Sequence, residues 1–148
     1  MEPHFNFMAI AVASLIPLVM GFLYYHPSLF GAAWMRANGF SKETMSPPAP
    51  TMYLLALVVS FLFAFFIAAN VTGGGGVDAS QVTAPDGHSY VTFGHGLAHG
   101  VIFAITVLLP IFVTMKIFEQ RSWGWAMVNW GYWALTVCVM GGLLSAWR

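Results

Sequence analysis

The sequence predicts an all-α membrane protein, a bundle of four transmembrane helices with a short interfacial helix after the first. Three observations support this fold class. Of the 148 residues, 59% are hydrophobic and only 7% are charged, whereas soluble domains carry roughly 25% charged residues. Four stretches reach the length of about 20 apolar residues that a membrane-spanning helix needs. None of the four contains Asp, Glu, Lys or Arg.

The four predicted spans form a single membrane domain and cover residues 6–25, 53–71, 93–115 and 125–147. Inside a bilayer each backbone amide needs a partner within its own segment, so isolated spans fold as helices. After Pro27, the short mixed stretch Ser28–Arg36 predicts an interfacial helix. The second span is apolar all round, which favours a lipid-exposed or subunit-packing helix. The Gly-rich segment 72–92 predicts a flexible outer loop.

The positive charges predict the direction of the spans. Arg36 and Lys42 lie in the first connection, and Lys116 and Arg121 lie in the third, whereas the long second connection has no Lys or Arg. Because cytoplasmic connections carry the excess of Lys and Arg, the first and third connections are predicted to be cytoplasmic. Only Arg148, at the C-terminal end, is a positive charge on the side predicted to be outside. We therefore expect a multi-pass membrane protein with both termini outside.

Charge and residue content exclude several classes of function. The formal net charge is zero, which excludes a nucleic-acid binder with a basic footprint. The single cysteine, Cys138, excludes an internal disulfide and a cysteine-based metal site. The sequence shows no nucleophile beside a base, no paired carboxylates and no phosphate-binding glycine loop. It therefore favours a non-enzymatic protein.

Two histidines at the start of the third span suggest a metal site. His95 and His99 are four residues apart, so on a helix they lie on one face, close enough to hold one cation. The helix N-terminus disfavours a protonated imidazole, and the neutral form is the one that binds metals. His88 or His4, with a carboxylate from the second connection, would complete the site. The possible cofactors are a transition metal or haem.

A packing role competes with the metal site. Gly94, Gly96 and Gly100 flank the same histidines, and Gly96 and Gly100 have the spacing that lets membrane helices touch backbone to backbone. The histidines would then form hydrogen bonds across that contact. We favour packing and keep proton or substrate handling as a third alternative. In the last span, we predict packing roles for Asn129, Gly141 and Gly142.

Three charged residues meet at the predicted cytoplasmic surface: Arg36, Glu119 and Arg121. One interpretation is an ion pair of Arg36 or Arg121 with Glu119 that fixes the helix hairpins at the interface. The alternative is an arginine that contacts a lipid headgroup or a substrate phosphate. We favour the ion pair, although exposed pairs contribute only about 0–1 kcal/mol.

Several segments resemble a known family. Gly21–Met35 resembles the first signature of the small bacterial and fungal membrane proteins grouped as domain of unknown function 1761. The closing signature of that family is similar to Phe118–Trp123, Asn129–Trp133 and Met140–Trp147, and His95–Gly100 is similar to a variant of Bacteroidetes-type members. The resemblance implies a bacterial multi-span membrane protein, expected in the inner (plasma) membrane, and no particular activity.

The leading functional expectation is a non-enzymatic membrane protein that acts as a homo-oligomer or as an accessory subunit of a membrane complex. Its expected partners are the lipid bilayer and copies of itself or other membrane proteins. One alternative is an outward-facing histidine site that binds a transition metal or haem for redox chemistry or transport. Another is a small carrier or lipid-handling protein that uses helices bent at Pro17 and Pro110.

Overall fold

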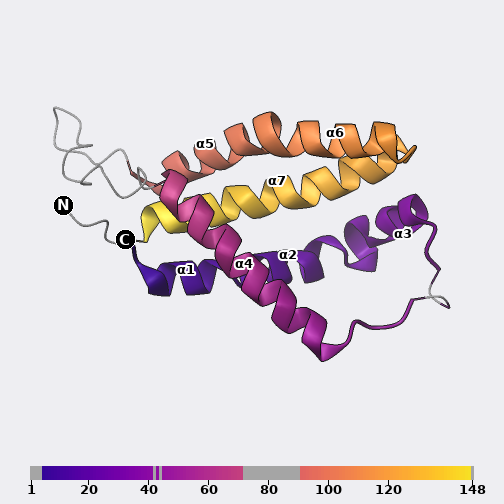
Figure 1. Ribbon diagram of the computed structural model, residues 1–148, viewed down its shortest axis with the longest axis horizontal. Helices are drawn as coiled ribbons and strands as arrows, with labels where there is room; N and C mark the ends of the chain where they lie inside the picture. Colours follow the sequence, from indigo (N-terminus) through magenta and orange to yellow (C-terminus); the bar gives the residue numbers. More distant parts are fainter. Residues whose placement is uncertain (1–4, 42, 44, 72–90, 148) are drawn as a thin grey trace.

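The computed structural model describes residues 5–41, 43, 45–71 and 91–147, and the predicted outer loop lies almost wholly outside them. Nine helical segments follow one another in these residues (Figure 1): α1 (Phe7–Ala13), α2 (Ile16–Tyr24), the turn η1 (Pro27–Gly31), α3 (Ala32–Asn38), α4 (Pro50–Val71), α5 (Phe93–Phe103), the π-helical turn η3 (Ala104–Leu108), α6 (Leu109–Phe118) and α7 (Trp123–Ala146). They make up four helices long and apolar enough to cross a membrane. The predicted fold class is confirmed.

The first span is divided between α1 and α2. Pro17 has no backbone N–H to donate to the carbonyl of Ala13, so the hydrogen bonding of the helix is interrupted there. The hydroxyl of Ser14, at the division, donates a hydrogen bond of 2.6 Å to the carbonyl of Ala11. On the neighbouring α7, the hydroxyl of Tyr132 donates a hydrogen bond of 2.7 Å to the carbonyl of Pro17. The proline therefore both divides the first span and fixes it to the last.

The third span changes its helical pitch at η3. Because Pro110 lacks an N–H and its ring collides with the carbonyl four residues earlier, the chain widens into a π turn just before it. The N–H of Leu109 accordingly donates to the carbonyl of Ala104, five residues back. The predicted span 93–115 is thus three segments, α5, η3 and α6.

Helix α7 is the centre of the molecule, with α5 and α6 running along one side of it (Figure 1). Its other neighbours are α1, α2, α3 and α4. The buried core draws on three helices: Ala9, Ile10 and Ala13 of α1, Ala64, Ile67, Ala68 and Val71 of α4, and Met140 and Leu144 of α7. One face of the second span is therefore buried against α1 and α7, although its sequence is apolar all round.

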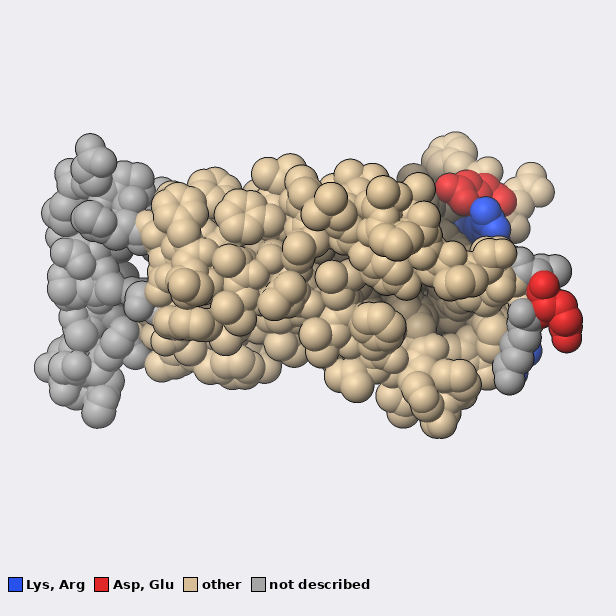
Figure 2. Space-filling view, turned by 90° about the horizontal axis from the view of Figure 1, so that it is seen from below, with Lys and Arg blue, Asp and Glu red and all other residues tan. Residues whose placement is uncertain are grey.

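The charged side chains that the structure describes occupy one end of the molecule. Figure 2 shows Lys, Arg, Asp and Glu at this end, beyond a long uncharged band. The described charged residues are Arg36, Glu43, Lys116, Glu119 and Arg121. The start of α1, the end of α4, the start of α5 and the end of α7 lie at the opposite end (Figure 1). The four helices thus run antiparallel in sequence order.

Candidate functional site

Helices α5 and α7 touch backbone to backbone. A β-carbon placed on Gly96 would overlap the carbonyl of Gly141, and one on Gly141 would overlap the carbonyl of Gly96. One turn later, a β-carbon on Gly100 would lie 2.6 Å from the Cα atom of Cys138. Side chains are excluded at these positions because real β-carbons do not approach other atoms so closely. The glycine spacing found in the sequence thus joins two helices of the same chain.

The other predicted packing glycines divide into two groups. A β-carbon on Gly142 would lie 2.5 Å from the ring of Phe93, so Gly142 belongs to the same contact. Gly94 is exposed, and a β-carbon placed on it would lie 3.7 Å from the hydroxyl oxygen of Thr92, an ordinary van der Waals contact. Ala98, one turn further along, is exposed as well. At 100° per residue, Gly94 and Ala98 face away from the α7 contact, and we call this pair the open face of α5.

The structure brings His95 and His99 together. Their ring centroids are 4.5 Å apart and the ring planes are tilted by 46°. The helix begins with a cap, in which the hydroxyl of Thr92 accepts a hydrogen bond of 3.3 Å from the backbone N–H of His95. Residues 5–41, 43, 45–71 and 91–147 contain no group of three or more His, Cys, Asp or Glu side chains able to hold a metal ion. His4 and His88 lie outside these ranges, so the metal site stays a prediction.

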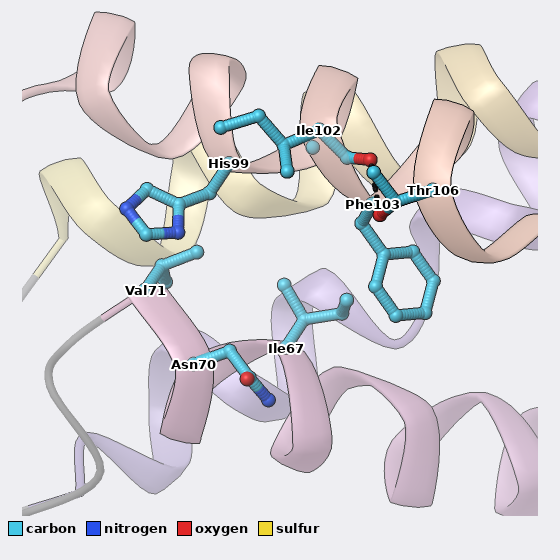
Figure 3. Close-up of a pocket in the computed structure, with 8 residues that line it drawn as sticks. Ile67, Asn70, Val71, His99, Ile102, Phe103 and Thr106 are labelled. Carbon is cyan, nitrogen blue, oxygen red and sulfur yellow. Dashed lines mark hydrogen bonds between the residues drawn. The ribbon is translucent and has the colours of Figure 1, made fainter.

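A pocket with a volume of about 150 Å³ lies between α4 and α5, and it includes His99. Figure 3 shows His99, Val71 and Asn70 toward one end, with Phe103 and Thr106 toward the other. The complete lining is Ile67, Asn70, Val71, His99, Gly100, Ile102, Phe103 and Thr106. The sequence does not predict this site, because no pattern in it aligns the second span with the third. The available signal was a lone Asn near the end of an apolar span.

Two of the polar residues in the pocket are partly satisfied by their own helices. The amide nitrogen of Asn70 donates a hydrogen bond of 2.8 Å to the carbonyl of Phe66. The hydroxyl of Thr106 donates one of 2.7 Å to the carbonyl of Ile102 (Figure 3). Thr106 has thereby used its single donor, whereas Asn70 keeps one further N–H and its carbonyl oxygen. His99 is exposed in the described structure.

Asn129 links helices near the charged end. Its side-chain oxygen accepts a hydrogen bond of 3.3 Å from the hydroxyl of Tyr25, and its amide nitrogen donates one of 2.8 Å to the carbonyl of Trp125. The indole N–H of Trp125 in turn donates a hydrogen bond of 3.1 Å to the side chain of Asn38. This chain of polar contacts ties the end of α2 and the end of α3 to the first turns of α7.

The charged end contains one of the two ion pairs that the sequence suggested. The Nε atom of Arg121 lies 3.2 Å from Oε2 of Glu119, and both side chains are more than two-fifths exposed. Arg36 is exposed on α3, and within the described part of the chain it forms no ion pair. Two cations at this end also lie over aromatic rings: Lys116 is 4.6 Å from the ring centroid of Trp123, and Arg121 is 5.7 Å from that of Trp125. Such exposed contacts are worth little energetically.

Together these features define a helical membrane protein of four spans, with a histidine pair and a small pocket near the end opposite the described charged residues. The chain belongs to a family described as protein of unknown function (DUF1761), whose model matches residues 8–145. The family resemblance read from the sequence is therefore confirmed. No curated protein and no solved structure matches the chain.

Proposed function

We propose that the protein is a non-enzymatic membrane protein that works as a homo-oligomer, with the open face of α5 as the contact between copies. The observation that carries this proposal is the exposure of Gly94 and Ala98, two small residues four apart on one side of a membrane helix. Membrane helices associate where small residues let their backbones approach. The second pair of this kind on α5, Gly96 and Gly100, is already filled by α7.

Exposed apolar residues alone would not support association. Leu97, Ile102 and Ile105 are at least two-fifths exposed on α5 and η3, but lipid tails cover such side chains equally well. Small residues differ because a lipid chain packs less tightly against a shallow groove than a second helix does. A contact that uses one patch on both copies is also self-complementary and closes as a twofold dimer.

The proposal includes an orientation in the inner membrane. The described Lys and Arg residues lie at one end, and the chain enters α1 and leaves α7 at the other. The positive-inside rule then puts the charged end in the cytoplasm and both termini outside. In this orientation the open face of α5, the histidine pair and the pocket belong to the outer half of the membrane.

One alternative is supported by a specific observation. The ring centroids of His95 and His99 are 4.5 Å apart, which favours a site for a transition metal or haem that opens outward. Such a site needs at least one more ligand. His88, which lies outside the described residues, or a second copy of the chain would have to supply it.

Disulfide crosslinking in native membranes tests the proposal. In a Cys138→Ala background, Ala98→Cys is oxidised and its product is compared with that of Val58→Cys, an exposed position on α4. A disulfide needs β-carbons about 4 Å apart, a separation that a small-residue helix contact provides. We expect a dimer from Ala98→Cys and none from Val58→Cys. A crosslink to a different protein would indicate the accessory-subunit role, and no crosslink at either position would contradict the proposal.

A further inference from the structure

We propose that the pocket between α4 and α5 binds the head end of a lipid acyl chain, with the carbonyl oxygen of the chain held by His99 and Asn70. This inference does not depend on self-association, because it uses the groove between α4 and α5 and not the open face of α5. It assigns a ligand class to the site in Figure 3.

The pocket has two chemical ends. His99 and Asn70 lie at the end formed by the last turn of α4, and the apolar side chains of Ile67, Ile102 and Phe103 dominate the remainder. The hydroxyl of Thr106, at the far end, donates its hydrogen bond to the carbonyl of Ile102. Its volume of about 150 Å³ matches a cavity that accommodates a molecule about the size of benzene. The pocket therefore takes a short section of an acyl chain next to its head and leaves the rest of the chain in the bilayer.

The polar end supplies hydrogen-bond donors. One N–H of Asn70 is used by the carbonyl of Phe66, so a second N–H is left, and a neutral histidine ring carries one N–H. A ligand oxygen at this end would accept a hydrogen bond from His99, and Asn70 lines the same end of the pocket with its second N–H. Water would satisfy these donors as well, but it would leave the apolar part of the pocket unfilled. A carbonyl attached to a hydrocarbon chain matches both ends.

The depth of the pocket agrees with this occupant. Asn70 is the last residue but one of α4, and His99 is the seventh residue of α5. With a rise of about 1.5 Å per residue, His99 lies only about 9 Å along the helix from its start. Both side chains are thus close to the membrane boundary, the level at which lipid carbonyl groups lie. An exposed imidazole deeper in hydrocarbon would have no polar partner.

Free fatty acids and phospholipids share this carbonyl chemistry, so both serve as probes. The purified protein is reconstituted with a diazirine-labelled fatty acid or with a phosphatidylcholine that carries the same labelled chain, irradiated, and mapped by peptide mass spectrometry. We expect labelling to concentrate on residues 67–71 and 99–106. A preference for one probe identifies the natural class of ligand. Labelling spread evenly over the exposed faces of all helices would overturn the proposal.

Two substitutions separate the pocket from general lipid contact. Ile102→Trp fills the pocket, and we expect labelling to fall about tenfold, whereas Ile105→Trp, outside the lining, leaves it unchanged. His99→Phe keeps a ring without a donor and is expected to weaken binding about fivefold, the equivalent of one hydrogen bond. His99→Gln keeps an N–H donor and should retain binding. Unchanged labelling in either Ile102→Trp or His99→Phe would overturn the proposal, even if the crosslinks at Ala98→Cys form as expected.

Discussion

Gly96 of α5 and Gly141 of α7 approach so closely that neither position has space for a β-carbon. The obstacle on each side is the backbone carbonyl of the other glycine, and a backbone moves less readily than the end of a side chain. The contact therefore fixes the distance between the third and fourth spans. Because α7 covers Gly96 and Gly100, this glycine pair is not accessible for association with another protein.

Gly96→Ala tests the tightness of this contact. The added methyl group has to push α5 away from α7, and overpacking of this kind typically costs about 1–3 kcal/mol of unfolding free energy. Gly94→Ala is the matched control, because its β-carbon meets only the hydroxyl oxygen of Thr92 at 3.7 Å. Thermal unfolding in detergent should show a lower midpoint for Gly96→Ala alone. Equal midpoints for the two variants would contradict the close contact.

Trp130 stabilises the π turn of the third span. Its indole N–H donates a hydrogen bond of 2.9 Å to the carbonyl of Ala104, which also accepts from the N–H of Leu109. Trp130→Phe removes this hydrogen bond and keeps an aromatic ring, so we expect a loss of about 1 kcal/mol of unfolding free energy. Trp147→Phe, at the exposed end of α7, should lose less. The same thermal unfolding assay compares the two variants. A larger loss of unfolding free energy for Trp147→Phe than for Trp130→Phe would exclude the stabilising role of Trp130.

The histidine pair should bind metal weakly. Two imidazoles make only half of a tetrahedral zinc site, so we expect Zn²⁺ to bind and to be removed readily by a chelator. The zinc content is measured by elemental analysis before and after chelation. The wild type is compared with the double variant His95→Ala and His99→Ala. An absorption spectrum of protein purified without chelator reports haem. Equal zinc content in wild type and variant would remove the pair from consideration as a metal site.

The orientation of the chain predicts where an engineered thiol can be labelled. In a Cys138→Ala background, Trp147→Cys is expected to face outward and Gln120→Cys, between the third and fourth spans, to face the cytoplasm. A membrane-impermeant thiol reagent added to right-side-out vesicles should therefore modify Trp147→Cys and spare Gln120→Cys until the vesicles are opened. The reverse pattern would turn the topology upside down and place the pocket in the cytoplasmic half.

Much of the fold followed from hydropathy, because length and apolar content determine which segments can cross a bilayer. The helical repeat also placed His95 beside His99 and Gly96 above Gly100. By contrast, the sequence could not show that Gly94 faces away from α7 while Gly96 faces it, since this depends on which side of α5 meets its neighbour. Local pattern determines which residues share a face, and only tertiary packing determines what covers it.

The pocket illustrates the same limit. Asn70 and His99 are 29 positions apart in the sequence, on two different spans, and no periodicity relates them. Pro17 and Pro110 did indicate that the first and third spans bend. They did not indicate that one span divides into two helices while the other forms a π turn, because that choice depends on the contacts of α7 with each.

Self-association through the open face of α5 is tested most directly by energy transfer between labelled copies in lipid vesicles. We predict transfer that persists when unlabelled lipid is added in moderate excess and that falls on addition of unlabelled protein. Gly94→Leu combined with Ala98→Leu should abolish the energy transfer, because both bulky side chains would lie between the two copies and separate them. Val58→Leu on α4 should leave the transfer unchanged. Transfer that is absent in the wild type, or unchanged in the double variant, would contradict the account.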